Sequence, residues 1–471
     1  MRIKLDNLYI KIILIFLLIF FAKLSGSLIV MSSIAALLLV IALSSKNNLL
    51  WYFLSILYAS NPMGLFKPYT FGLNIGFTTL DFSLLLLLIL FFKTINKKRN
   101  YNFYNTNTKF LLIILLILNI LNGLIVGIGS VQELFRTVKL LIPWLAIPLG
   151  LKIIDKEDDF YSFFKLGAFV VFVSFLAQIT VYYLGVELSH FLFGAEISSK
   201  YEGRTIDVND HLSRIVYAVY LCGIVIIGMF TILYKQQVKI NFLYYGMIFL
   251  GLLSVVMSGT RAWSIAYIVL TVIIIIKSAQ FVLRRFISLS IGVIIVLFLL
   301  SYIPFISKQF NMSLDRILTV EKLAEGDLTA GGTAERFDVR GPKVLDAFFE
   351  TNIVFGAGFS NYNYENTEAH VGLHSLLLEG GVIGFIIVQG VLIFVIINLI
   401  MLSIKSKRPE FLYIAALLIA WELVNTSKTT FVVLTSPDTG TAISFIFVYI
   451  SFLYHTNYNN VRQIQNTSTI S

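Results

Sequence analysis

Long apolar runs recur from one end of this chain to the other. Many of them are about 17 to 25 residues long, the length that an α-helix rising about 1.5 Å per residue needs to cross roughly 30 Å of hydrocarbon. The runs lack the alternation between lipid-facing and interior residues that barrel strands show. Because a bilayer offers no hydrogen-bond partner to an open backbone, the pattern predicts membrane-spanning helices.

The runs define about 14 candidate spans. They cover residues 8–22, 27–44, 48–60, 78–92, 110–128, 138–154, 161–184, 213–234, 240–257, 262–276, 286–305, 375–402, 410–425 and 439–455. Several are short or closely spaced, so about 12 spans, with some segments re-entrant or tilted, is the alternative. We predict an all-α, polytopic transmembrane helical bundle of about 12–14 helices. It forms a single domain at 1–455, followed by a cytoplasmic disordered tail at 456–471.

The distribution of charge orients these spans. Of all residues 58% are hydrophobic and only 13% are charged, with a formal net charge of +10. The basic residues gather in every second connection between the runs, as the positive-inside rule expects of cytoplasmic loops. These connections contain Lys46; Lys93, Lys97, Lys98, Arg99 and Lys109; Lys152 and Lys156; Lys235 and Lys239; Lys277, Arg284 and Arg285; and Lys405, Lys407 and Arg408. We therefore predict cytoplasmic termini, outer loops at 185–212 and 306–373, and no nucleic-acid partner.

One arginine stands where a membrane protein should not tolerate it without a reason. The segment SGTRAW at 258–263 places Arg261 between two apolar runs at their outer ends. An arginine there is unfavourable unless it faces a polar cavity or extends outward to the headgroups. It can be an interfacial anchor beside Trp263. It can also bind an anion, because a planar guanidinium matches phosphate oxygens in a bidentate way.

The large outer loop contains two further features. The segment TAERFDVR at 333–340 sets Arg336 and Arg340 four residues apart, on one face of a helix. A solvated surface helix is the alternative interpretation. The segment FGAGF at 355–359 is a glycine-bearing turn, which lets the backbone approach a ligand or another segment closely.

The strongest polar cluster opens the span at 375–402. The segment AHVGLHSLLLEGGVIGF at 369–385 has His370 and His374 about one turn apart and Glu379 further along. Ionisable residues at a membrane boundary indicate function, and near-neutral imidazoles suit proton transfer. A catalytic site and a proton relay or transport site fit this spacing equally. A metal site is disfavoured, because no HExxH pattern or third ligand accompanies the histidines.

Weaker candidates lie on the predicted outer side. Arg136 and Lys139 stand at the start of a span, where positive residues run against the inside rule. Arg204 belongs to the polar segment 203–214 of the second outer loop. Either set can line an outward-facing anionic cavity or anchor helix ends at the headgroups.

Three segments, in this order, resemble motifs of the bacterial O-antigen ligase and polymerase superfamily of polysaccharide-assembly membrane enzymes. Segment 258–263 resembles its serine-arginine motif, and segment 336–359 is similar to its arginine followed by a Gly-x-Gly turn. Segment 370–384 resembles its His-Asn-x-x-Leu-x-x-x-x-Glu-x-Gly-x-x-Gly pattern. The residues in register are His370, Glu379, Gly381 and Gly384.

The chain departs from this pattern at three places. Val371 replaces the usual asparagine, His374 stands where leucine is common, and no proline precedes the glycine turn. These departures leave open whether His370 or His374 is the active histidine, and the register favours His370.

The resemblance implies a metal-independent, inverting glycosyltransferase that needs no cofactor. Its donor would be an oligosaccharide linked to undecaprenyl pyrophosphate, a leaving group that arginines stabilise at a water-poor site. A near-neutral imidazole suits removal of the acceptor proton. The implied site residues are His370 as general base, Arg261, Arg336, Arg340 and Arg136 as pyrophosphate ligands, and His374, Glu379 and Arg204 as additional candidates.

Two alternatives stay open. Within the superfamily, a polymerase of O-antigen, capsule or exopolysaccharide competes with a ligase that transfers a finished chain to lipid A core or protein; motif divergence, typical of enzymes that meet varied repeat units, favours the polymerase. A lipid-linked oligosaccharide flippase is the alternative of another class, although a transporter is expected to show repeated halves. The expected location is the inner (cytoplasmic) membrane, with the site facing the periplasm or extracellular side. The expected partners are membrane lipid and a chain-length regulator.

Overall fold

The computed structural model describes most of the chain and is helical in all its regular elements there. The described residues are 7–25, 27–59, 82–127, 141–193, 218–235, 242–257, 262–276, 302, 304, 307, 311, 336–368, 371–425 and 437–468. No strand occurs among them, so the predicted all-α class is confirmed for this part of the chain.

The order of elements follows the predicted spans closely. The elements are α1 (Asn7–Leu24), α2 (Leu28–Ser44), α3 (Asn48–Ala59), α4 (Phe82–Thr94), α5 (Thr106–Val126), η1 (Ile142–Leu145), α7 (Ala146–Ile153), α8 (Glu157–Phe193), α10 (Val219–Tyr234), α11 (Phe242–Met257), η3 (Arg336–Arg340), α15 (Gly341–Phe349), α16 (Asn361–Asn366), α17 (Gly372–Ser406), α18 (Pro409–Asn425) and α19 (Pro437–Ser468). A further apolar helix covers Ala262–Ile276. Only the predicted span at 286–305 falls almost wholly outside the described residues.

Three of the described helices are long and apolar enough to cross a membrane. They are Thr106–Val126, Gly372–Ser406 and Thr439–Asn457, which correspond to α5, α17 and the first part of α19. A further set of apolar helices, from Leu8–Ala22 to Ala262–Ile276, has 10–17 residues each. Membrane association is therefore supported by length and composition, and the number of crossings stays a prediction.

Three elements differ from the predicted bounds. The described part of the span predicted at 138–154 contains the 3-10 turn η1, where Pro143 lacks the amide hydrogen that an α-helical hydrogen bond needs. Helix α8 extends to Phe193, so part of the predicted outer loop at 185–212 is helical. Helix α19 continues to Ser468, whereas the sequence predicted a disordered tail from 456. No glycine or proline interrupts residues 455–468, so nothing in the local sequence stops the helix.

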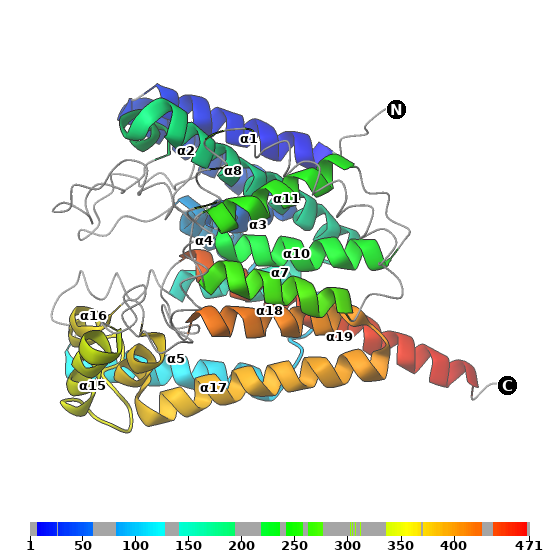
Figure 1. The fold of residues 1–471 in the computed structure, drawn as a ribbon. Coiled ribbons are helices and arrows are strands. Elements are labelled where there is room, and N and C mark those ends of the chain that lie inside the picture. The colour runs from blue at the N-terminus through cyan, green and yellow to red at the C-terminus, as the bar shows by residue number, and fades with distance from the viewer. Residues whose placement is uncertain are drawn as a thin grey trace.

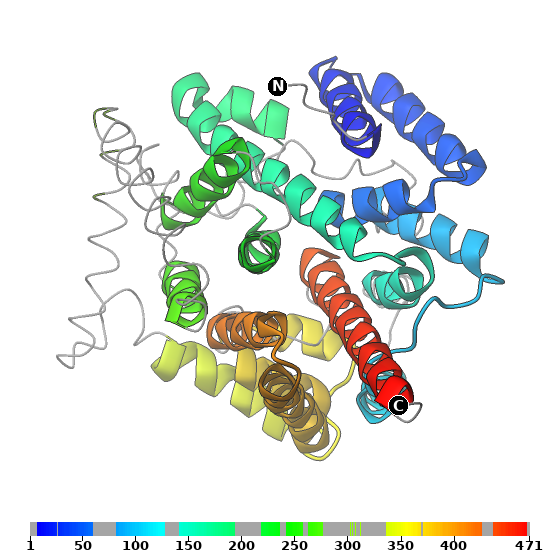
Figure 2. The same cartoon turned by 90° about the vertical axis from the view of Figure 1, so that its right-hand side faces the viewer.

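An aromatic core forms where α8 packs against α19. Phe163 stacks on Phe445 with ring centroids 3.9 Å apart, and Phe160 lies 4.7 Å from Tyr449. Helix α10 packs beside them against α8, α18 and α19 and is buried along almost its whole length. In Figures 1 and 2, α1 and α2 (blue) and α17 (amber) lie on opposite sides of this core.

Several described basic connections meet at one end of the molecule, which we call the basic end. The ammonium of Lys93 donates to the carbonyls of Ala42 and Ser45, and that of Lys152 donates to the carbonyls of Thr94 and Ile95. A second group of basic residues at this end begins with the ion pair of Glu157, five residues after Lys152. It comprises Lys235 with Glu157 and Glu410, and Arg408 with Thr456. The C-terminus lies at this end, on the right of Figure 1.

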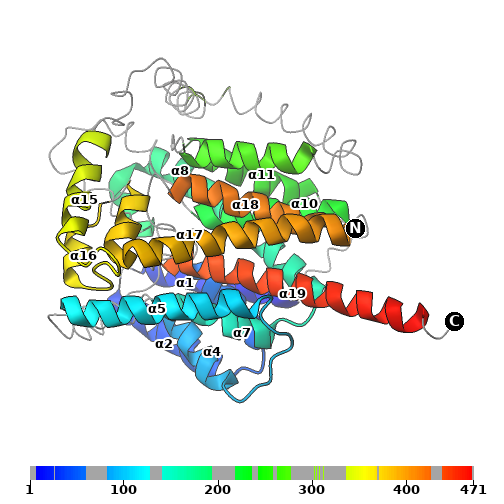
Figure 3. The same ribbon diagram turned by 90° about the horizontal axis from the view of Figure 1, so that it is seen from below.

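The opposite end, which we call the loop end, holds the described part of the large loop. In Figure 1, α15 and α16 (yellow) lie on the left beside the first turns of α17. Val344 and Phe348 of α15 form an apolar cluster with Val371 and Leu378, which attaches the loop to α17. Figure 3 shows α5 (cyan) running alongside α17 to the same end. The described basic connections and the described part of the large loop thus lie at opposite ends.

Candidate functional site at the loop end

The structure describes some of the predicted site residues and not others. Arg136, Arg204, Arg261 and His370 lie outside the described residues. Arg336 is described in its backbone only, at the start of the π-helical turn η3, and Arg340 ends the same turn. His374 and Glu379 lie in the first turns of α17.

The second and third motif segments pack directly on one another. Helix α17 is broken at Gly381, whose φ of 61° and ψ of −169° are not helical. A break of this kind leaves carbonyls before it and amides after it without intrahelical partners. Residues 353–359, which we call the glycine turn, provide those partners. Four backbone bonds join the two segments: Ala357 N to Leu378 O (2.7 Å), Gly358 N to Glu379 O (2.8 Å), Val382 N to Ile353 O (3.0 Å) and Ile383 N to Val354 O (3.1 Å).

Gly381 must be glycine for this contact to form. Its positive φ lies in a region that other residues rarely adopt. A Cβ built on Gly381 would lie only 2.5 Å from the amide nitrogens of Phe355 and Gly356. Because both obstacles are backbone, no rotamer change relieves them. The glycine turn predicted to approach a ligand or another segment thus approaches another segment, the break in α17.

Helix α5 closes the third side of the same contact. The amide of Phe359 donates to the carbonyl of Asn119 over 3.0 Å, and Nδ2 of Asn122 donates to the carbonyl of Phe355 over 2.7 Å. A Cβ built on Gly123 would lie 2.9 Å from the backbone of Phe359. The turn is therefore held between α5 and α17, two of the described helices that are long enough to cross a membrane.

Glu379 is the most enclosed ionisable group of the site. Its side chain is 7% exposed. Within the described part of the chain, Oε1 of Glu379 has no hydrogen-bond partner. A buried carboxyl oxygen without a hydrogen-bond partner is unfavourable, so the position of Glu379 needs a structural or functional reason.

His374 and Arg340 reach the same end from different elements. His374 is half-buried in the first turn of α17, and Arg340 precedes α15, which packs on α17. The helix start is fixed locally, because the hydroxyl of Ser375 donates a hydrogen bond to the backbone carbonyl of Glu368. The carboxylate of Glu368 forms an ion pair with Lys343. An imidazole, a guanidinium and a buried carboxyl thus share one end of the molecule. Such groups can bind an anion and accept a proton.

Trp263 of the first motif occupies a different environment from the one expected of an interfacial anchor. It is 4% exposed, and its ring lies 4.9 Å from that of Tyr220 in an edge-on contact. Tyr220 also contacts Trp421 of α18. Trp263 therefore fixes the helix Ala262–Ile276 to α10 in the protein interior, and Arg261 immediately precedes this packed helix.

Sequence reasoning did not identify the contribution of α5. Asn119, Asn122 and Gly123 follow one another at the i, i+3, i+4 spacing of a single helix face, inside an otherwise apolar run. Polar residues within a span usually face the protein interior and have a functional or packing role. That spacing was the available signal. It indicates a polar face on α5, although not which segment binds it.

Replacing Asn122 by alanine is expected to lower the free energy of unfolding by about 1–2 kcal/mol, because the carbonyl of Phe355 loses its donor. Asn107→Ala provides a matched control, since Asn107 is exposed in the first turn of the same helix. Thermal unfolding of the detergent-purified variants, followed by circular dichroism, measures the difference. Equal midpoints for the two variants would contradict the role assigned to Asn122.

Comparison with known proteins does not add a family to this geometry. No family model matches the chain, and no curated protein is significantly similar to it. The features that indicate a function are therefore the glycine turn, the break in α17 and the polar residues gathered around them.

Proposed function

We propose that the chain is a bacterial surface-polysaccharide polymerase of the inner membrane, acting on O-antigen, capsule or exopolysaccharide. One observation carries the proposal: the two segments that resemble the second and third motifs of the ligase and polymerase superfamily pack on each other through four backbone hydrogen bonds. One motif glycine from each segment, Gly356 and Gly381, lies in that contact, where a Cβ would clash with the backbone of the other segment. Two resemblances separated along the chain thus describe one place in the fold.

The proposed topology is a bundle of 12–14 helices with cytoplasmic termini. The gathering of Lys93, Lys152, Lys235 and Arg408 at the basic end supports it, because connections rich in lysine and arginine stay in the cytoplasm. The loop end would then face the periplasm or the extracellular side. A lipid-linked glycan would reach the site from the outer leaflet.

In the proposed reaction, a hydroxyl oxygen of the acceptor sugar attacks the anomeric carbon of the donor glycan. The bond between that carbon and the pyrophosphate oxygen breaks, and undecaprenyl pyrophosphate leaves with the electron pair. His370 would take the hydroxyl proton as general base. Attack from the face opposite the leaving group inverts the anomeric centre.

The leaving group needs charge stabilisation more than protonation, which is a role for arginine. Arg261 and Arg336 would bind the pyrophosphate, with Arg340 and Arg136 assisting. Glu379 would contribute as a buried carboxyl beneath the helix start, and a chain-length regulator would be the protein partner. The proposal requires neither a metal nor a cofactor.

A gel of surface polysaccharide and lipid-linked intermediates tests this function in cells that express His370→Ala at the wild-type level. The expected result is loss of the polymer ladder and accumulation of single repeat units. His455→Ala is the matched control, because His455 lies at the basic end and stacks on Tyr101; its ladder should be unchanged. His374→Ala, run beside them, distinguishes the two candidate bases.

The other outcomes identify the alternatives. Full-length polymer that stays on the lipid carrier would indicate a ligase, because chain growth would then be intact and transfer lost. An unchanged ladder in both His370→Ala and His374→Ala would exclude a histidine base and favour the flippase.

A further inference from the structure

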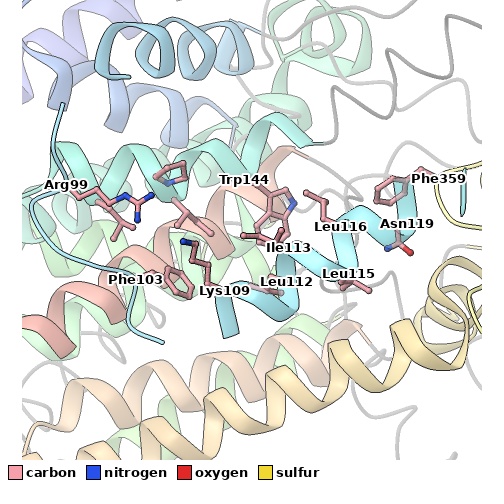
Figure 4. Close-up of a pocket in the computed structure, with 13 residues that line it drawn as sticks. Arg99, Phe103, Lys109, Leu112, Ile113, Leu115, Leu116, Asn119, Trp144 and Phe359 are labelled. Carbon is pink, nitrogen blue, oxygen red and sulfur yellow. The ribbon is translucent and has the colours of Figure 1, made fainter. Parts of the chain in front are cut away.

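An apolar groove lies on the side of α5 that faces away from α17. It has a volume of about 250 Å³ and lies between α5 and the consecutive elements η1 and α7 (Figure 4). Leu112, Leu115 and Leu116 line it from α5, and Trp144 and Ile147 from the opposite side. The neighbouring side chains Ile114 and Ile117 of α5 are exposed, so the groove continues onto an apolar outer surface.

The groove runs parallel to α5 over about half of that helix. It extends along α5 from Lys109 to Asn119, and Phe359 of the glycine turn lines its deep end beside Asn119 (Figure 4). Ten residues of helix correspond to about 15 Å, which is half of the roughly 30 Å of hydrocarbon in a bilayer. The groove therefore matches the depth of one leaflet, measured from the basic end.

Two cations stand at the open end of the groove. Arg99 and Lys109 line it there, Arg99 exposed and Lys109 half-buried. Within the described part of the chain, neither has a carboxylate partner, whereas Lys235 at the same end binds Glu157 and Glu410. Among the described residues that line the groove, none is acidic. Positive charge at the mouth of an apolar groove is complementary to a lipid with an anionic headgroup.

We propose that this groove binds one acyl chain of an anionic glycerophospholipid from the leaflet at the basic end, with the lipid phosphate between Arg99 and Lys109. The depth of one leaflet favours such a lipid over a polyprenyl chain, whose pyrophosphate would bind at the loop end. The acyl chain would fill the gap between α5 and α7 and end against Phe359. This inference requires a membrane location and is independent of the proposed polymerase activity.

Trp144 provides a direct probe, because it lines the groove while Trp51, Trp263 and Trp421 are buried. The full chain in detergent micelles is titrated with brominated phosphatidylglycerol, and tryptophan fluorescence is recorded. Saturable quenching is expected with this lipid, and much weaker quenching with brominated phosphatidylcholine. Trp144→Phe is expected to remove the saturable component.

Charge variants test the headgroup site. Arg99→Ala and Lys109→Ala should each weaken the apparent affinity about fivefold, the effect expected of one basic residue near a lipid surface. Lys97→Ala is the matched control, since Lys97 is exposed on the same connection and does not line the groove. Its affinity should be unchanged.

Four results would overturn the proposal. Saturable quenching that survives in Trp144→Phe would place the lipid elsewhere. Equal affinity for phosphatidylcholine, or equal effects of Lys97→Ala and Arg99→Ala, would remove the headgroup site. Displacement of brominated phosphatidylglycerol by a lower concentration of undecaprenyl phosphate would assign the groove to the carrier lipid.

Discussion

Gly358→Ala is expected to detach the glycine turn from α5 and to lower the free energy of unfolding by roughly 3 kcal/mol. Two effects add. Gly358 has a φ of 59°, where an L-residue with a side chain is strained by about 1–2 kcal/mol. A Cβ there would also lie 2.5 Å from the carbonyl oxygen of Asn119, so the backbones of the turn and α5 would have to separate.

Separation of these backbones would have consequences beyond stability. The hydrogen bonds from Phe359 to Asn119 and from Asn122 to Phe355 would be broken or stretched together. The same turn also pairs with the break in α17 next to Glu379. Gly358→Ala is therefore expected to remove the polymer ladder as well, even where some folded protein reaches the membrane.

Gly390→Ala is the control for this substitution. Gly390 lies in α17, the helix that the glycine turn contacts, and a Cβ built on Gly390 meets nothing within 4 Å. Alanine is a better helix former than glycine, so this variant should be as stable as the original chain or slightly more stable. Thermal unfolding in detergent by circular dichroism compares the two. A Gly358→Ala midpoint equal to that of Gly390→Ala would show that the turn does not bind α5 as the structure describes.

The helices themselves follow from the sequence because each apolar run determines its own helix. Membrane-length runs need no information from distant residues, and α5, α10 and α17 overlap the ranges that the pattern predicts. The break in α17 is different. Gly380 and Gly381 permit a break, but it exists because residues 353–359 supply the missing hydrogen-bond partners.

The hydrogen-bond partners within the site cannot be predicted from the local sequence for the same reason. The hydrogen bond of Asn122 to Phe355 joins residues separated by 233 positions. The sequence shows that a glycine turn must approach something, and that α5 has a polar face. Which two surfaces meet depends on the packing of α5, α15 and α17 together, and no periodicity contains that information.

At the basic end, the sequence predicts that the connections are positively charged, but it does not predict which acidic residues pair with the lysines. The positive-inside rule counts lysine and arginine and takes little account of acidic residues. Glu157 and Glu410 lie at the starts of α8 and α18, where a carboxylate interacts favourably with the helix dipole. That local role can be predicted from the sequence. Their shared contact with Lys235 comes from the packing of α8, α10 and α18.

Lys235→Met is expected to lower the free energy of unfolding by about 3 kcal/mol or more. Glu410 is only 1% exposed, and one of its carboxyl oxygens lies 3.6 Å from the Lys235 ammonium. Lys235 also binds Glu157 and lies over the ring of Tyr161. Its removal leaves a buried carboxylate without this cation, and such a charge is far more unfavourable than the loss of the pair itself.

A double variant separates the buried charge from other effects of the substitution. Lys235→Met combined with Glu410→Gln should recover most of the lost stability, because the neutral amide needs no cation. Lys343→Met is the exposed control: its ion pair with Glu368 is 2.7 Å long, but the lysine side chain is 53% exposed, so the effect should stay below about 1 kcal/mol. Equilibrium unfolding in mixed micelles measures all three variants. If Lys235→Met is no less stable than Lys343→Met, or if Glu410→Gln does not rescue it, Lys235 does not hold α8, α10 and α18 together through these carboxylates.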